Sequence, residues 1–261
     1  MPELPDRDDL EARVAALMRR VNAHQRDVVL TYLGWPPDAR RIPRKLLAEM
    51  EQQVEGAMYG VLALMFMQSA EQLQDRLGYS MREDSLTRAG HEWAKNQARF
   101  VAQSTVQTKL GKVVSSIEEL ASGTPAIGSS GVFTVTPGIS QPDWEQLIVD
   151  AFNDANANVI ASTEATQAAT AGEKEVASDF NKSTGKILEA FWRHRKAKNA
   201  RHPCVKVCQP LENQPSYRWP EIHPTMPWVW NGPPAHPNCD CELEWIELTP
   251  AQAAAFGIIG G

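Results

Sequence analysis

The sequence predicts a mostly α-helical protein, in which long N-terminal helices form an arm or bundle and a small α+β, cysteine-rich module follows. Two observations predict this fold. Up to about residue 120, apolar side chains recur at the three- and four-residue spacing of helices. All four cysteines then fall within residues 191–248, a proline-rich segment bounded by two short stretches of alternating character. With 43% hydrophobic and 22% charged residues, the 261-residue chain has the composition of a globular protein.

Three long helices are expected in the first part of the chain, at residues 6–33, 43–77 and about 83–120. The first carries Asp6 as a cap and further acidic residues in its first turn, which suits the positive end of a helix dipole. Glycine follows the first two, as it often does at helix ends. Because no matching sheet accompanies these helices, we expect residues 1–120 to form a helical arm or bundle that docks on a larger partner.

The second half of the chain begins with a change in character. Glycine, serine and proline dominate residues 121–140, which are expected to form a linker. A helix is predicted from about residue 141 to 171, with a break at Gly172 and a further helix to about residue 180. Two strands are predicted on either side of the cysteine-rich loop, at residues 186–195 and 241–248. Residues 141–261 are therefore expected to form the α+β module.

The cysteines show a spacing that is typical of a metal site. A C-x3-C pair is followed, after 27 residues, by H-x-x-C-x-C. Thiolate and imidazole groups suit tetrahedral zinc, whose structural sites take four ligands. Five residues compete for these four positions: Cys204, Cys208, His236, Cys239 and Cys241. Two other interpretations remain open, namely free thiols packed among tryptophans and a disulfide. Under each interpretation we expect the four cysteines to converge, with His236 near them.

A basic stretch lies at the start of the same loop. Five of its side chains are candidates for contact with phosphate or DNA: Arg193, Arg195, Lys196, Lys198 and Arg201. The alternative is a solvated surface loop. The chain as a whole has a net charge of -6, so it is not built to coat nucleic acid.

Several classes of function find no support in the sequence. The longest apolar run, Ala57–Met67, is well short of the roughly 20 residues that a membrane span needs. No signal peptide is visible at the N-terminus, so the cysteines are expected to meet a reducing environment. No phosphate-binding loop, dinucleotide-binding motif or nucleophile elbow occurs. We therefore expect a protein that does not span a membrane and is not an enzyme.

Two segments together resemble a known family. The first is Asn158-Val159-Ile160-Ala161-Ser162-Thr163-Glu164, with Ala168 and Gly172 beyond it, and the second is H-P-N-C-x-C at residues 236–241. With a tryptophan-bearing strand at Trp192 between them, this order resembles the phage head morphogenesis family, the Mu F-like minor head proteins, over about residues 85–248. The chain differs from the family's usual pattern at Ser162 and Asp240, and in its C-x3-C spacing.

The resemblance implies a minor structural protein of a tailed bacteriophage, located in the virion at the portal vertex or head interior. It implies a role in head assembly, genome packaging or ejection. The partners would be the portal, major capsid or scaffold protein, and viral DNA is a further candidate. Thr163, Glu164 and Trp192 would be structural residues, with Glu164 at least partly buried and holding its helix against the strands. The alternatives are a zinc-stabilised nucleic-acid-binding module and an enzymatic toxin or transferase domain.

Overall fold

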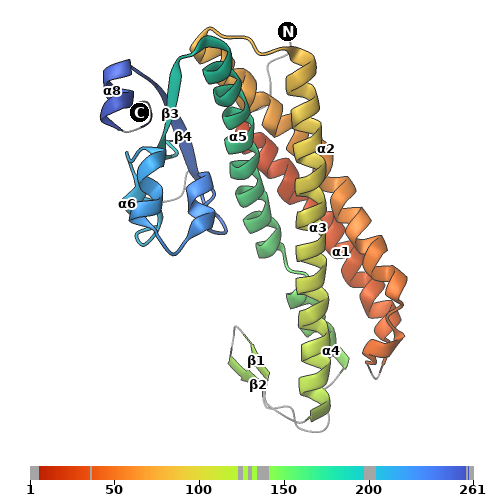
Figure 1. Cartoon of the computed structure of the whole chain (residues 1–261). Coiled ribbons are helices and arrows are strands. Elements are labelled where there is room, and N and C mark those ends of the chain that lie inside the picture. The colour runs from red at the N-terminus through yellow and green to blue at the C-terminus, as the bar shows by residue number, and fades with distance from the viewer. Residues whose placement is uncertain are drawn as a thin grey trace. The chain divides into compact units, whose positions relative to one another are not determined.

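The computed structural model describes residues 6–35, 37–122, 126–128, 131–133, 141–196, 204–256 and 258. Within them the chain is mostly helical, with long N-terminal helices and a small C-terminal segment that holds a two-stranded sheet and the cysteines, so the predicted fold class is confirmed (Figure 1). The elements follow in the order α1 (Arg7–Leu33), η1 (Ala39–Arg41), α2 (Arg44–Leu77), α3 (Glu83–Ser122), β1 (Ala126–Gly128), β2 (Gly131–Phe133), α4 (Gln141–Ala151), α5 (Asp154–Thr184), β3 (Ile187–His194), α6 (Cys208–Leu211), η2 (Ser216–Arg218), α7 (Trp219–Ile222), η3 (Pro227–Asn231), β4 (Cys241–Leu248) and α8 (Pro250–Ala255).

The first three helices lie within two residues of their predicted ranges. The Asp6 carboxylate accepts a hydrogen bond from Asp9 N at 2.9 Å and so caps α1 as expected. Gly34 and Gly78 follow α1 and α2 with φ of 63° and 58°, a left-handed conformation that glycine adopts without strain. Local patterning therefore determines where these helices begin and end. None of the described helices combines the length and apolarity that a membrane crossing requires.

The helical stretch after residue 140 differs from the prediction. It is interrupted after Ala151, and the Asn153 side chain accepts a hydrogen bond from Asn156 N at 3.2 Å where α5 begins. The predicted break at Gly172 is wrong, since α5 continues through it. A Cβ atom at Gly172 would lie 2.2 Å from the carbonyl oxygen of Phe66 on α2. Gly172 thus permits two helices to approach closely, and the sequence alone does not separate that role from a helix end.

The two predicted strands are confirmed to within a residue. β3 and β4 pair antiparallel over their full length, which places His194 opposite Cys241. The segment after α6 is attached to β3 by main-chain hydrogen bonds: Trp192 N donates to Gln214 O at 3.0 Å, and Asn213 N donates to Trp192 O at 2.9 Å. The cysteine-rich loop is therefore tied to the sheet along one of its strands.

The chain divides into two compact units, each built from segments that are distant in sequence. Unit 1 comprises Met1–Arg13, Gly60–Lys95 and Asn158–Gly261, and unit 2 comprises Val14–Tyr59 and Asn96–Ala157. The division expected at residues 121–140 does not coincide with these units, because α1, α2 and α3 each contribute residues to both. Within that expected linker the structure describes the end of α3 and the hairpin of β1 and β2, and the remaining residues lie outside the described part.

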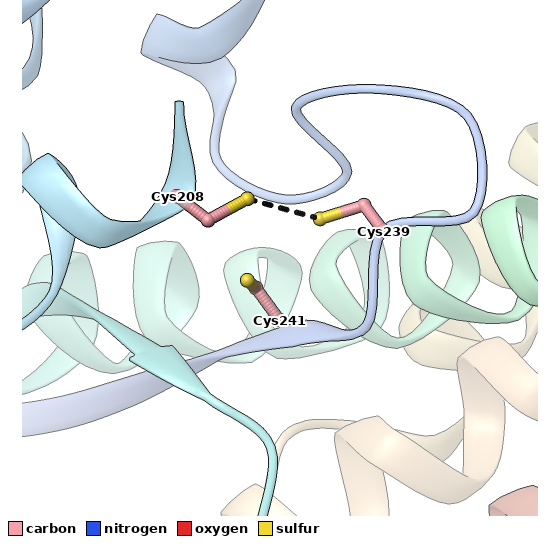
Figure 2. Close-up of side chains that lie close together, drawn as sticks. All are labelled: Cys208, Cys239 and Cys241. Atoms are coloured by element: carbon pink, nitrogen blue, oxygen red, sulfur yellow. Dashed lines mark hydrogen bonds between the residues drawn. The ribbon is translucent and has the colours of Figure 1, made fainter. Parts of the chain in front are cut away.

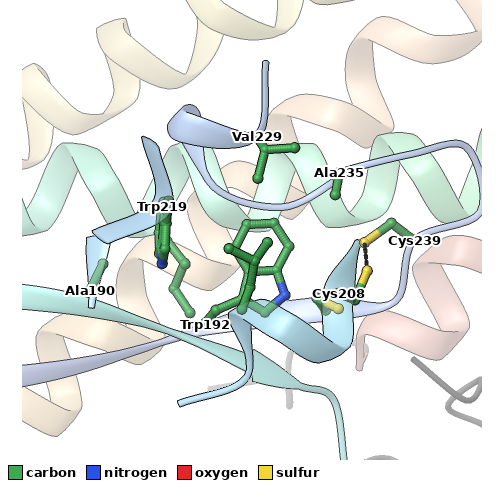
Figure 3. Close-up of a cluster of buried hydrophobic side chains, with 10 residues drawn as sticks. Ala190, Trp192, Cys208, Trp219, Val229, Ala235 and Cys239 are labelled. Atoms are coloured by element: carbon green, nitrogen blue, oxygen red, sulfur yellow. Dashed lines mark hydrogen bonds between the residues drawn. The ribbon is translucent and has the colours of Figure 1, made fainter. Parts of the chain in front are cut away.

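Unit 1 contains two clusters of buried side chains. The first, here called the tryptophan–cysteine cluster, lies in the C-terminal segment (Figure 3). Its buried members are Ala190, Trp192, Cys208, Leu211, Trp219, Val229, Ala235, Cys239, Cys241 and Leu243. Trp192 meets Trp219 edge to face, with 5.3 Å between the ring centroids. The second cluster unites α2, α3, α5 and β3 through side chains that include Phe66, Leu73, Leu86, Val176, Phe180 and Leu188. Residues 60–95 therefore complete the core on which the C-terminal strands rest.

Unit 2 has an apolar helical core with polar groups inside it. Its buried apolar residues include Met18, Met50, Val106 and Ile148. Lys109 is only 3% exposed, and its ammonium group donates a hydrogen bond to the Asn22 side chain and lies 5.5 Å from the centre of the Phe152 ring. Burial lowers the pKa of Lys109 to about 8, because the charged form loses its hydration.

Candidate metal centre

Three thiols converge in the tryptophan–cysteine cluster of unit 1 (Figure 2). Cys208 opens α6, Cys239 lies in the loop before β4, and Cys241 is the first residue of β4. Their sulfur atoms all lie within 4.8 Å of one another, and the Cys208 and Cys239 sulfurs are 4.0 Å apart. All three side chains are buried, and the four cysteines of the chain are free thiols. The group can hold a metal ion, because three soft ligands already lie around one point.

The C-x-C spacing explains why two of these thiols lie together. Residues two apart in extended backbone project to the same face, so the two thiols share a face and Asp240 projects from the other. Arg195 N donates to Asp240 O at 3.2 Å, which extends the ladder of the sheet by one residue. Cys239 N donates to His236 O at 3.1 Å and closes a turn in which Asn238 has φ of 64°. Asparagine tolerates this left-handed conformation better than most residues.

His236 lies beside one of the three thiols, although its ring nitrogens are not among the atoms that all lie within 4.8 Å of one another. Its Nε2 atom lies 3.1 Å from the Cys208 sulfur. Its Nδ1 atom lies 2.9 Å from the carbonyl oxygen of Pro237, which can only accept a hydrogen bond. In the neutral tautomer that donates this bond, the proton is on Nδ1 and Nε2 keeps its lone pair. This is the tautomer of metal-ligating histidines, whose other ring nitrogen donates to a carbonyl or carboxylate.

Cys204 lies at the edge of this group, so all four cysteines belong to or pack against one cluster. It is half-buried and packs against the tryptophan–cysteine cluster, but its sulfur is not among those that lie within 4.8 Å of one another. Its carbonyl oxygen accepts hydrogen bonds from Cys208 N and Gln209 N, both at 3.0 Å. Cys204 thus occupies the turn that leads into α6, whereas the ring of His236 contacts the sulfur of Cys208.

The three thiols differ in how readily each one ionises. Hydrogen bonds to Cys208 and Cys241 lower the pKa of Cys239, because they stabilise its thiolate. The hydrogen bond to Cys239 raises the pKa of Cys208 to about 12, and the bonds to Cys208 and Cys239 raise the pKa of Cys241. Three neighbouring thiolates would repel one another. A divalent cation would supply the positive charge that lets all three ionise together.

Helix α5 holds the loop that carries Cys239. The Thr163 hydroxyl accepts a hydrogen bond from Asn238 N at 2.8 Å, and the Thr166 hydroxyl donates to Cys239 O at 2.7 Å. Thr166 is fully buried, so water does not compete for its bond. The segment around residues 158–164 and the H-P-N-C-x-C motif therefore touch each other. Glu164 on the same helix is 7% exposed, in agreement with the expected burial.

The basic stretch does not present the free positive charges that the sequence indicated. Arg193 pairs with Glu244 on the neighbouring strand. Arg195, whose side chain is 10% exposed, pairs with Asp8 and with Asp240. The charges of these two arginines are balanced within the chain, and contact with phosphate stays a prediction. The other candidates are Lys196, which is exposed, and Lys198 and Arg201, which lie outside the described residues.

A second titratable group of unit 1 lies near the same strands. Glu173 on α5 accepts a hydrogen bond from Trp245 Nε1 at 3.1 Å and pairs with Arg76 at 3.2 Å. Burial raises the pKa of Glu173 to about 7, although Arg76 and Trp245 oppose the change. The residue borders cavities of about 520 Å³ and 220 Å³, and the smaller of these also reaches Cys241. Glu173 therefore titrates near neutral pH.

Several residues around the centre carry no clear signal in the sequence. Thr166 has a weak one, since it shares a helix face with Thr163 three residues earlier. Asp240 stands out only as a departure from a family pattern, and Asp8 only as an acidic residue in a first helical turn. Their roles depend on contacts between residues far apart in the chain, which no local pattern encodes.

The chain matches no protein-family model, no curated protein and no solved structure. Three buried thiols that lie close together could hold a metal ion.

Proposed function

We propose that the chain is a minor structural protein of a tailed-bacteriophage head, and that one structural zinc ion stabilises its C-terminal segment. The ligands are Cys208, Cys239, Cys241 and His236. The observation that carries the proposal is the convergence of three buried thiols, with His236 Nε2 3.1 Å from the sulfur of Cys208. The role in the head comes from the resemblance of residues 158–164 and 236–241 to the Mu F-like family.

The loop between the strands supports the metal part of the proposal. Between β3 and β4, the described residues form only short helices of three to five residues and turns. Such a segment makes few repeating main-chain hydrogen bonds, and its prolines prevent it from forming a longer helix. A metal bound to α6, to the loop and to β4 crosslinks three separate parts of this segment. The binding energy of a structural zinc ion then becomes folding energy.

The contact between the two resembling segments supports the structural role. Thr163 receives the main-chain hydrogen bond of Asn238, and Thr166 bonds to the carbonyl oxygen of Cys239. The residues that carry the resemblance therefore stabilise one another. We infer a non-catalytic protein that attaches to the portal, major capsid or scaffold protein within the virion. Contact with viral DNA is less well supported, because Arg193 and Arg195 are balanced by carboxylates.

The experiment that tests the proposal is incorporation into heads. The full chain is produced together with the portal, scaffold and major capsid proteins encoded by the same genome, and purified particles are analysed by mass spectrometry. We expect a few copies of the wild type per particle. The Cys239→Ser variant should be excluded, since loss of a ligand unfolds the segment. Cys204→Ser, which leaves the ligand set intact, is the matched control and should enter particles.

Two results would count against separate parts of the proposal. Particles that exclude the wild-type chain, and that package and deliver DNA equally well without its gene, would overturn the role in the head. Purified protein with less than about half an equivalent of zinc would overturn the metal centre, since a structural site holds its ion tightly. The first result says nothing about zinc and the second says nothing about incorporation, so each part is judged on its own.

A further inference from the structure

We propose that the metal centre controls a latch that holds the first turns of α1 against the C-terminal segment of unit 1. The inference rests on the proposed zinc site and adds a regulatory role to it. The anchor of the latch is Asp240, which stands between two of the proposed ligands. Arg7, Asp8 and Arg195 complete the latch. When the metal is bound the anchor is fixed, and when the metal is lost the start of α1 is released.

The anchor lies on a segment with two faces. The thiols of Cys239 and Cys241 project to the metal side, and the intervening Asp240 projects to the other side. The Asp240 side chain is only 2% exposed, so it lies within the protein. Because three consecutive residues form the segment, a movement of either cysteine also moves the carboxylate between them.

Two arginines connect this carboxylate to the start of α1. Arg195 lies 3.3 Å from Asp240 Oδ1 through Nη1 and 2.5 Å from Asp8 Oδ1 through Nη2. Arg7 lies 3.8 Å from Asp240 Oδ1 and also donates a hydrogen bond to Thr166, the residue that bonds to Cys239 O. The first turn of α1 is therefore joined by polar contacts to both sides of the cysteine segment.

The latch depends on the position of the Asp240 carboxylate. Burial and the nearby charge of Arg195 both lower the pKa of Arg7, and Asp240 opposes them. The side chains of Arg7 and Arg195 are 17% and 10% exposed, so water screens their repulsion only weakly. Moving the carboxylate away removes the negative charge that Arg7 and Arg195 share and leaves Asp8 as the ion-pair partner of Arg195 alone, so the repulsion between the two arginines is less well compensated. The start of α1 is then expected to detach.

Metal binding and the latch are coupled through the chain itself. With zinc bound, both neighbours of Asp240 are fixed to one ion. Without it, the loop before β4 loses its crosslink and regains conformational freedom. A cavity of about 220 Å³, whose lining includes Arg7, Arg195 and Cys241, leaves room for these side chains to move. Loss of the metal is therefore expected to release the beginning of α1.

Amide hydrogen exchange in the full chain tests the latch. Peptides covering residues 8–13 are compared between the zinc-loaded protein and protein stripped with a chelator under reducing conditions. We expect exchange there to speed up about tenfold on zinc removal, as for a locally opened helix end. A peptide from residues 44–59 of unit 2 should not change. Asp8→Asn, which lies far from the ligands in sequence, should speed exchange at residues 8–13 while zinc stays bound.

A control variant on the same strand as Cys241 distinguishes the loss of the latch from the loss of any surface charge. Glu247→Gln on β4 removes an exposed ion pair with Lys186, which precedes β3, and should change nothing at residues 8–13. Unchanged exchange in zinc-bound Asp8→Asn and Asp240→Asn overturns the latch. If exchange at residues 8–13 is faster in these variants but unchanged when zinc is removed, the ion pairs hold α1 and the metal does not control them. A wild-type chain that binds no zinc overturns the proposed centre and its control of α1, and the two variants then still show whether the ion pairs hold the helix.

Discussion

Unit 2 and unit 1 are stabilised in different ways. Unit 2 consists mainly of regular helices whose apolar faces are buried. Its Lys109 is also buried, and this burial lowers the pKa of the side chain. Unit 1 contains an irregular loop, and around that loop lie thiols, tryptophans and pairs of opposite charges such as Arg195 with Asp240. Helices satisfy their own main-chain groups, whereas a loop of turns and short helices needs crosslinks to be held. The difference predicts which perturbations each unit tolerates.

The largest expected effect is the loss of a metal ligand, which should affect unit 1 and spare unit 2. Cys239→Ser is expected to abolish zinc binding and remove stabilisation on the order of 10 kcal/mol, the scale of structural zinc in small domains. Peptide-resolved hydrogen exchange measures this as lost protection at residues 187–194 and 241–248, with residues 44–59 unchanged. Cys204→Ser should cost only about 1 kcal/mol, since a half-buried side chain changes little in size. Equal damage from both variants would make Cys204 a ligand.

For unit 2, the pH dependence of stability is compared between the wild type and Lys109→Met. The folded pKa of about 8 lies below the ordinary value of 10.5, so the folded state binds fewer protons between these values. Stability of wild-type unit 2 should therefore rise as pH increases from about 8 to 10.5, by about 3 kcal/mol. The variant should be more stable than the wild type at pH 7, and its stability should not change with pH over this window. Denaturant unfolding at several pH values measures the free energy of unfolding. A wild type whose stability does not change between about pH 8 and 10.5 would contradict the buried, charged Lys109.

Glu173→Gln provides the matching experiment in unit 1, with the opposite sign. The folded pKa of about 7 lies above the ordinary value of 4.5, so the folded state binds more protons between these values. Stability of unit 1 should fall as pH rises from about 4.5 to 7, by about 2–3 kcal/mol, and stay level above that. The variant should lose this slope. Exchange at residues 241–248 reports it, with Glu247→Gln as the control for an exposed carboxylate, and an unchanged slope would refute the assignment.

Two glycines in helices offer a smaller contrast between the units. Gly172→Ala in unit 1 places a Cβ atom 2.2 Å from Phe66 O and should destabilise by about 1–3 kcal/mol through overpacking. Gly111→Ala in unit 2 meets nothing within 4 Å and should stabilise by about 0.5–1 kcal/mol, because alanine favours helix. Melting curves of the two variants distinguish them. Similar shifts in both would show that the close approach of α2 and α5 is not tight.

An effect of similar size is expected for the hydrogen bond between α5 and the cysteine loop. Thr166→Val keeps the shape of the side chain but removes the bond to Cys239 O, and should cost about 1–3 kcal/mol because a buried carbonyl loses its partner. Zinc should still bind, with faster release in competition with a chelator. Thr108→Val, whose hydroxyl donates to Ser104 O within its own helix, is the control. No difference between the two variants would remove Thr166 from the support of the centre.

The regular parts of the fold could be predicted from the sequence, because their signals are local. Helix spacing and end glycines place α1, α2 and α3, and alternation places β3 and β4. Gly172 misled this approach, since a close contact with α2 and a helix end both call for glycine. The thiols of the C-x-C motif could be grouped from alternation, but the choice between Cys204 and His236 depends on how the loop folds back. The ion pairs of Arg195 join segments that are distant in the chain. Composition alone could not show these pairs, so the positive charges of the basic stretch were expected to be unpaired.

X-ray absorption at the zinc edge of the purified full chain tests the central claim most directly. The account predicts one zinc ion with three sulfur ligands at about 2.3 Å and one nitrogen ligand at about 2.0 Å, supplied by Cys208, Cys239, Cys241 and His236. His236→Ala should change the nitrogen signal, and Cys204→Ser should leave the spectrum unaltered. Four sulfur ligands, or a protein that retains no zinc under reducing conditions, would contradict it.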